Sequence, residues 1–170
     1  MAIRNIVTLG DDVLRKVCRT QLTFDSKLHT ILDDMKETMY KAEGVGLAAP
    51  QVGLLRRFCI IDVGEGLIEL INPVITETSG SQTDNEGCLS LPGRSGHVKR
   101  PNFVKVKALN RKGEEYVLEG TELLARAICH ETDHLDGRLY IDVAEYMYAP
   151  EEEEERVSPR LRKYARRRER

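Results

Sequence analysis

The feature that most constrains this chain is the sequence His130-Glu131-Thr132-Asp133-His134, which has the pattern H-E-x-x-H. The apolar run 123–128 precedes it, so the segment predicts a buried helix with Gly137 as its C-cap. Histidines at i and i+4 lie on one helix face and can bind one divalent metal ion. Glu131 could then act on a metal-bound water as a general base. The alternative, an exposed helix with two solvated histidines, is disfavoured by the apolar run.

The composition fits a single globular domain with its own core. Of 170 residues, 41% are apolar and 32% charged, and the net charge is -2. This charge gives no general attraction to nucleic acid or membranes. No apolar run approaches the length of a membrane span, and we expect no signal peptide. The four cysteines lack C-x-x-C spacing, so we interpret them as reduced thiols of a cytoplasmic protein.

Hydrophobic periodicity predicts two helices, then several strands, then the H-E-x-x-H helix, which is the order of an α+β fold. A short helix is expected at 11–19. A clearer amphipathic helix begins after Asp25 or Ser26 and continues to Gly44. Alternating or β-branched runs between turn signals predict the strands, which are residues 55–63, 67–76, 104–110 and, more weakly, 115–118.

A catalytic metal site of this kind takes a third protein ligand, and the H-E-x-x-H motif does not identify it. Cys88 is one candidate, because glycines flank it in the segment 86–93 and let the backbone approach a ligand closely. His97 reads as an exposed loop residue, and His29 as a solvated or capping one. Asp136 should point away from the ligand face, whereas Glu145 remains possible by count alone.

A second glycine-rich segment spans residues 44–53. It has too many small residues to predict a core strand, and it lacks the Lys and Ser/Thr of a phosphate-binding loop. Small side chains would let an extended peptide pair with its backbone. Gln51 is its one long polar side chain, and the amide could donate to a carbonyl oxygen that develops negative charge.

Together these segments resemble the peptide deformylase family, which carries G-x-G-x-A-A-x-Q, E-G-C-x-S and H-E-x-x-H in that order. The matching stretches are 44–51, 86–90 and 130–134, and the resemblance covers about residue 3 to Asp142. It implies an α+β fold of antiparallel strands packed around a central metal-binding helix. It also implies a hydrolase that removes the formyl group from the N-terminal formyl-methionine of nascent polypeptides and releases formate.

The resemblance implies a metal centre at the matching residues. Cys88, His130 and His134 would bind one divalent ion, Fe²⁺ in the usual native form, with Zn²⁺, Ni²⁺ or Co²⁺ as substitutes. Metal-bound hydroxide would attack the formyl carbonyl, and Glu131 would be the general acid/base.

The resemblance further implies the residues that contact the substrate. The Gln51 side chain and the Leu89 backbone N–H would form the oxyanion hole. Gly46 would hold the substrate backbone. Val45 and Ala127 would help to line the methionine pocket.

Two expectations concern the segment that follows Cys88. Residues 92–97 are interpreted as a loop that varies within the family, so no substrate contact is assigned to it. Glu86 and Arg100 are interpreted as a buried pair that braces the Cys88 segment.

Two other function classes were weighed. A zinc peptidase that shares only H-E-x-x-H would take a carboxylate or histidine as its third ligand, and Cys88→Ser would then leave metal binding largely intact. A non-catalytic protein with a structural metal would have four protein ligands and no use for Glu131. The presence of both Gln51 and Glu131 favours the deformylase.

The sequence divides into a single catalytic domain, residues 1–148, and a charged tail, residues 149–170. Five glutamates at 151–155 precede eight Lys and Arg residues in 156–170. The tail could be a solvated segment or a charged helix. Its basic part could bind an anionic partner such as the RNA of the ribosome, without sequence specificity.

Overall fold

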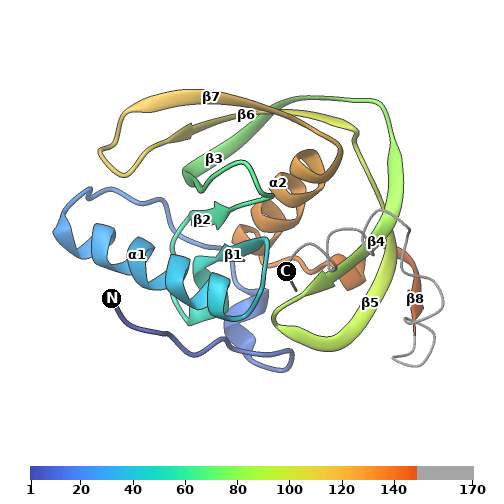
Figure 1. Ribbon diagram of the computed structural model, residues 1–170, viewed down its shortest axis with the longest axis horizontal. Helices are drawn as coiled ribbons and strands as arrows, with labels where there is room; N and C mark the ends of the chain where they lie inside the picture. The colour runs from blue at the N-terminus through green and yellow to red at the C-terminus, as the bar shows by residue number, and fades with distance from the viewer. Residues whose placement is uncertain (149–170) are drawn as a thin grey trace.

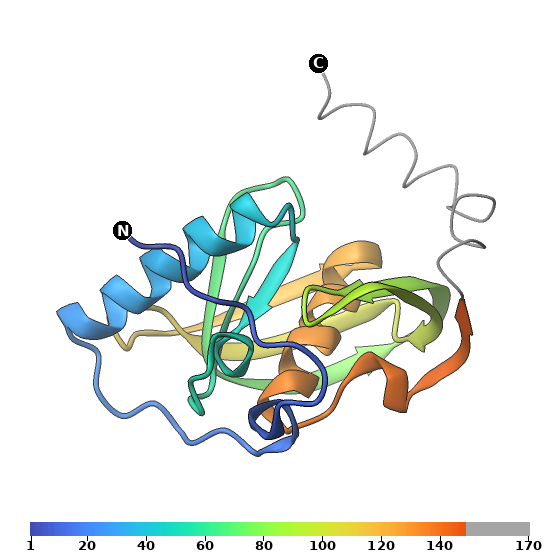
Figure 2. The same ribbon diagram turned by 90° about the horizontal axis from the view of Figure 1, so that it is seen from below.

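The computed structural model describes residues 1–148, and residues 149–170, with every expectation for the charged tail, lie outside the described part (Figures 1 and 2). The described chain has two α-helices and two antiparallel sheets. Helix α2, Glu122–Leu135, lies near the centre of the molecule in Figure 1, so the expected α+β fold around this helix is confirmed.

The larger sheet has five strands in the order β1-β2-β3-β6-β7, each antiparallel to its neighbours. Its buried face packs against α2 through Ile128, which shares one core cluster with Leu70, Val104 and Val106. The strands are β1 Gly46–Ala48, β2 Phe58–Ile61, β3 Ile68–Ser79, β6 Phe103–Leu109 and β7 Glu115–Thr121.

The smaller sheet has the order β4-β5-β8 and supplies the other side of the site. Strand β4 is Gln82–Cys88, β5 is Leu91–Arg100, and β8 is Ala144–Tyr148. A short 3₁₀ turn, η3 (Tyr140–Asp142), connects the end of α2 to β8. Strand β4 ends at Cys88, so the Cys88 side chain lies close to α2.

Helix α1, Ser26–Lys41, covers the β1–β2 end of the larger sheet. The Asp25 carboxylate accepts the Leu28 N–H at 3.0 Å, which is the expected N-cap bond. Its apolar face, which includes Leu32 and Met35, packs against Phe58 and closes a second core cluster. The predicted amphipathic helix is therefore confirmed, although it ends three residues before Gly44.

The predicted helix at 11–19 is wrong. Only a 3₁₀ turn, η1 (Asp12–Arg15), forms there, and the chain is extended again at Lys16. Leu14 is buried, but Val17 is 68% exposed. The segment therefore has no continuous apolar face to pack, and packing is what stabilises most short helices.

The segment 92–97 is not a loop but part of β5. Its glycine and proline content hid a strand that pairs with β4 on one side and β8 on the other. At Gly96 a Cβ would lie 2.6 Å from Met147 Sδ and 3.1 Å from Tyr146 O, so the glycine is needed for β8 to pack closely. His97 is accordingly half-buried on a strand, not exposed on a loop.

The segment 44–53 also contains a strand that the sequence did not predict. Residues 46–48 form β1 and pair with β2, and all three are buried. Residues Ala49–Val52 follow as a 3₁₀ turn, η2. Small side chains here permit close packing and do not prevent pairing.

The C-cap of α2 is Asp136, one residue before the expected Gly137, which follows as the C′ residue with the left-handed φ of +73°. The Arg138 N–H donates to Asp133 O at 2.9 Å, and Arg15 O lies 2.5 Å from where a Cβ of residue 137 would be. Among residues 1–148, no helix is long and apolar enough to cross a membrane.

The N-terminal segment is held to α1 by the buried carboxylate of Asp34. Its Oδ1 accepts the Ala2 N–H at 2.7 Å and its Oδ2 accepts Arg4 Nε at 3.1 Å. The Ala2 hydrogen bond is the main reason why the pKa of Asp34 lies below the model-compound value of 3.8, and Arg4 adds to it.

We predict that Asp34→Asn lowers stability by about 1.5–3 kcal/mol at pH 7, the range for hydrogen bonds to a charged group. Because the folded state lowers the pKa, this stability is present above about pH 4 and is lost as the pH falls below it. Thermal unfolding of both proteins at a series of pH values measures the difference. A difference in Tm that stays constant down to pH 3 would contradict the assignment.

Candidate metal centre and active site

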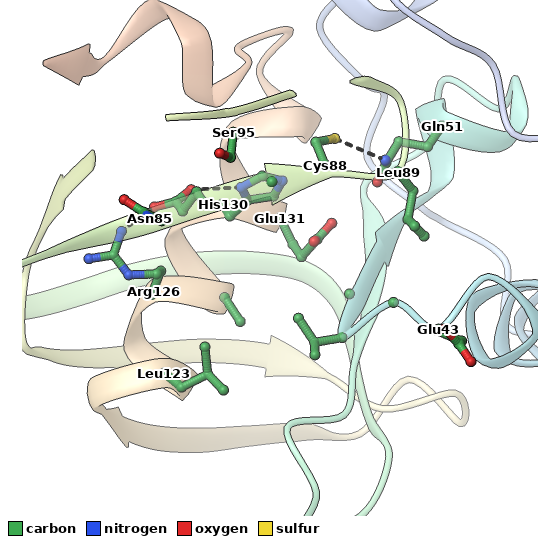
Figure 3. A pocket seen from close by; sticks show the side chains of 16 residues that line it. Glu43, Gln51, Asn85, Cys88, Leu89, Ser95, Leu123, Arg126, His130 and Glu131 are labelled. Carbon is green, nitrogen blue, oxygen red and sulfur yellow. Dashed lines mark hydrogen bonds and ion pairs between the residues drawn. The ribbon is translucent and has the colours of Figure 1, made fainter. Parts of the chain in front are cut away.

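A cavity of about 410 Å³ lies between α2, β4 and the β1 end of the larger sheet. Figure 3 shows Cys88, Gln51, His130 and Glu131 around it, with Leu123 farther along α2. Its walls are mostly apolar. Gln51 and Glu131 lie at the end where Cys88 and His130 are, whereas Glu43 lies apart from them. The shape suits an apolar side chain with a reacting group at one end.

Three potential metal ligands converge at that end. The ligand atoms of Cys88, His130 and His134 all lie within 4.8 Å of one another. Cys88 Sγ is 3.4 Å from His134 Nε2, and the two imidazole rings are 5.0 Å apart. The structure thus brings together the three residues expected to bind the metal, two from one face of α2 and one from the end of β4.

The Glu86 carboxylate fixes the orientation of this cluster. It lies two residues before Cys88 on β4, and its Oε1 is 2.7 Å from His130 Nδ1. Arg100 donates to both of its oxygens, at 2.8 and 3.0 Å, and Arg126 donates to Oε2 at 2.6 Å. With the Nδ1 of His130 held by Glu86, its Nε2 is the nitrogen left to coordinate. The expected Glu86–Arg100 pair is confirmed.

These partners set the charges at the site. Burial would raise the pKa of Glu86, but hydrogen bonds from Arg100 and His130 lower it to about 2. Burial would lower the pKa of His130, but Cys88 and Glu86 raise it to about 10, so this ring would have to release a proton when it coordinates a metal ion. Burial lowers the pKa of His134 and keeps its ring neutral, as coordination requires.

A divalent metal fits these residues. One thiol and two imidazoles form a donor set that Zn²⁺ and Fe²⁺ accept. Two such ligands on one tetrahedral ion are roughly 3.5 Å apart, and the observed Sγ to Nε2 distance is 3.4 Å. Three protein ligands also leave room for water or substrate, which distinguishes a catalytic from a structural site.

The Glu131 carboxyl group lies beside this cluster, and Glu131 is only 4% exposed. Its Oε2 is buried and has no hydrogen-bond partner within residues 1–148. Burial raises its pKa to about 7, against the lowering effect of His130. A Cβ at Gly46 would overlap the Glu131 carboxylate, so only glycine at position 46 leaves space for it.

The other expected site residues also meet at the cavity. Gln51, on η2, places Nε2 3.4 Å from Cys88 Sγ, and its Oε1 accepts the Ala48 N–H at 2.9 Å. Leu89 follows Cys88 directly, and its side chain packs against Gly44. The remaining three expected residues, Val45, Gly46 and Ala127, all line the cavity.

The residues considered as other third ligands lie elsewhere. His29 Nε2 is 2.7 Å from Arg111 O, and His97 Nδ1 is 3.2 Å from Asn85 Oδ1. Asp136 pairs with Arg57 at 2.9 Å, and Glu145 is exposed on β8. Within residues 1–148, none of them joins the group of Cys88, His130 and His134.

Three supporting residues were missed by sequence reasoning. Arg126 binds Glu86 from α2, Asp133 binds Arg100 at 2.7 Å, and the Tyr140 ring stacks on His130 at 5.9 Å. A charged residue in the apolar run before H-E-x-x-H was the available signal for Arg126. The contact of Tyr140 with His130 could not be predicted from the sequence, because it depends on where the 3₁₀ turn η3 lies relative to α2.

The fold and this group of side chains define a metal-dependent hydrolase with an open pocket beside the candidate metal ligands. The family model described as polypeptide deformylase matches residues 3–148. The chain therefore belongs to the polypeptide deformylase family, whose members remove the formyl group from the N-terminal methionine of nascent peptides.

Individual peptide deformylases are similar to this protein along most of its sequence. The peptide deformylase of Alkaliphilus metalliredigens is 63% identical over 142 residues, which are 84% of this chain and 97% of that protein. Peptide deformylase 1 of Clostridium acetobutylicum is 62% identical over 142 residues, 84% of this chain and 95% of that protein. The crystal structure of the Thermotoga maritima peptide deformylase has 42% identity and a TM-score of 0.84, and the match covers 85% of this chain and 99% of that one.

We predict that Glu86→Gln weakens metal binding about 10- to 100-fold, because residues that orient a ligand have effects of this size. Competition with a chelator of known affinity measures the change. Glu69→Gln is the matched control, since Glu69 also pairs with an arginine, Arg111 at 2.7 Å, but lies away from the cavity lining. Equal affinity in both variants would contradict the role of Glu86.

Proposed function

We propose that this chain deformylates N-formyl-methionyl peptides with Cys88, His130 and His134 holding one divalent metal ion. The observation that carries the proposal is the convergence of these three ligands beside a buried carboxylate with a free oxygen, Glu131 Oε2. We propose Fe²⁺ as the native ion, with Zn²⁺, Ni²⁺ or Co²⁺ as substitutes. When bound, the metal would polarise the formyl carbonyl and activate water at neutral pH.

Glu131 is the proton carrier of the proposed reaction. Its carboxylate accepts the proton of the attacking water, and the resulting acid later donates it to the departing amine. Burial supports this role, because it raises the pKa of Glu131 to about 7 and so allows both proton states near neutral pH. Gly46, directly against the carboxylate, keeps a side chain from displacing it.

Gln51 Nε2 and the Leu89 backbone N–H are the proposed donors to the oxygen that becomes negative. Nε2 faces the metal ligands, since it lies 3.4 Å from Cys88 Sγ. The packing of Leu89 against Gly44 restrains the second donor. Loss of one such donor costs about 10²- to 10³-fold in kcat.

The proposed substrate lies with its methionine side chain in the cavity. Val45 and Ala127 line it, and the Gly46 backbone stands next to the reacting end. The methionine side chain is unbranched and apolar, which suits the mostly apolar wall.

We predict that Glu131→Gln lowers the release of formate from formyl-Met-Ala-Ser at least about 100-fold, because the proton carrier is lost. The protein is prepared without oxygen and loaded with Fe²⁺, and metal content is measured in each sample. Near-normal turnover by the variant at full metal content would refute the role of Glu131.

The same assay separates this proposal from a zinc peptidase. Cys88→Ser should lose metal and activity, whereas Cys129→Ser should keep both, since Cys129 is buried outside the ligand group. Cleavage of unblocked peptides by a Cys88→Ser protein that retains its metal would instead favour the peptidase.

We propose residues 1–148 as the catalytic domain of a cytoplasmic enzyme and the basic part of 149–170 as a contact to the ribosome. The tail's sequence supports this, since eight of its residues are Lys or Arg. We expect the protein to sediment with ribosomes at low salt and to be released at high salt, because phosphate contacts are screened. Charge reversal of the tail arginines should abolish the binding, and binding that survives the reversal would place the contact elsewhere.

A further inference from the structure

The amide of Gln51 is held in one orientation before any substrate arrives. Gln51 is 1% exposed, and its Oε1 accepts the Ala48 N–H at 2.9 Å. Because an N–H must face an acceptor, the oxygen of the amide is assigned to this side and the NH₂ group to the other. The NH₂ group therefore faces Cys88 and Ser90.

The two protons of this NH₂ group have different partners. Nε2 donates to Ser90 Oγ at 3.1 Å and lies 3.4 Å from Cys88 Sγ. Ser90 is fully buried, so no water competes for this bond. One proton is thus directed to the hydroxyl, and geometry directs the other toward the reacting end of the cavity.

Ser90 is itself tied to Gln51 through the backbone. The Leu9 N–H donates to Ser90 O at 2.9 Å, and the Val7 N–H donates to Gln51 O at 2.8 Å. The extended N-terminal segment therefore joins the turn after β4 to η2. These two bonds fix the distance between the Ser90 hydroxyl and the Gln51 amide.

We propose that Ser90 is a positioning residue that aims the Gln51 amide at the developing oxyanion. This inference rests on the proposed function, in which Gln51 is an oxyanion donor. Without the hydroxyl, the amide would keep its Ala48 bond and its longer contact with Cys88 Sγ at 3.4 Å, and its NH₂ group could shift toward that sulfur. The bond to substrate oxygen would then weaken in the transition state, whereas substrate binding in the ground state would change little.

If Ser90 were only structural, Ser90→Ala would lower stability and leave kcat unchanged. Any variant that removes a buried hydroxyl and leaves its donor without a partner should lower stability in this way. Thr38 is the matched control, since it is also buried, its hydroxyl accepts the Arg4 N–H at 2.9 Å, and it does not line the cavity. Thr38→Val should therefore lower Tm and leave kcat unchanged.

The test is a double-mutant cycle in formate release, with wild type, Ser90→Ala, Gln51→Ala and the double variant at equal metal content. We expect Ser90→Ala to lower kcat about tenfold, a fraction of the loss of a whole donor, with KM within about twofold. In the Gln51→Ala background the same change should have no further effect. Should Ser90→Ala not fold, Ser90→Cys offers a weak acceptor of similar size and should give an intermediate kcat.

The outcomes separate the inference from the function. Wild-type kcat in Ser90→Ala or Ser90→Cys, or an equal loss in both backgrounds, would overturn the positioning role while the deformylase activity stands. Absence of formate from the metal-loaded wild type would overturn the proposed function and this inference with it.

Discussion

The structure depends on one buried carboxylate, Glu86. An isolated charge at this depth would be very costly, and Arg100, Arg126 and His130 each offset part of the cost. These partners come from β5 and α2, while Glu86 lies on β4. The carboxylate thereby connects the smaller sheet to the central helix, and the same contacts determine which nitrogen of His130 faces the cavity.

The site exists because two sheets meet on one helix. The larger sheet gives α2 its apolar contact and contributes β1, whose Gly46 lies against Glu131. Strand β4 of the smaller sheet ends at Cys88, so a thiol from this sheet lies beside the two histidines of α2. A bound metal would link the smaller sheet to the helix, and its binding free energy would add to the stability of their contact.

The sequence predicts much of this arrangement, and its failures have physical reasons. Periodicity and apolar runs identified α1, α2 and four strands of the larger sheet, β2, β3, β6 and β7. They missed β1, because its small residues do not resemble a core strand. Sequence reasoning missed β5 because glycine is typical of turns. At Gly96 the glycine is instead required by β8, since Met147 and Tyr146 occupy the space that a Cβ would need. The helix predicted at 11–19 was wrong for the opposite reason: the apolar spacing resembles a helix, but only Leu14 is buried and Val17 is 68% exposed, so only the 3₁₀ turn η1 forms.

In the site, too, local patterns were predicted and contacts between distant residues mostly were not. Each expected site residue was found from local pattern or from family resemblance. The structure places eight of the nine in the lining of one cavity, and the ninth, His134, beside Cys88 and His130. Apart from the Glu86–Arg100 pair, the supporting contacts were not predicted, since they join residues far apart in sequence. Arg126 reaches Glu86 over 40 positions, and Leu9 reaches Ser90 through backbone atoms that carry no sequence signal.

The unequal burial of the four thiols has a consequence for chemical labelling. Cys18, Cys59 and Cys129 are buried, and burial raises the pKa of each, to about 11 for Cys18 and Cys129. Cys88 is half-buried and lines the cavity. An alkylating reagent small enough to enter would therefore modify a single position in the folded protein. A coordinated metal would shield that sulfur, so the rate of alkylation would report how much of the enzyme is loaded.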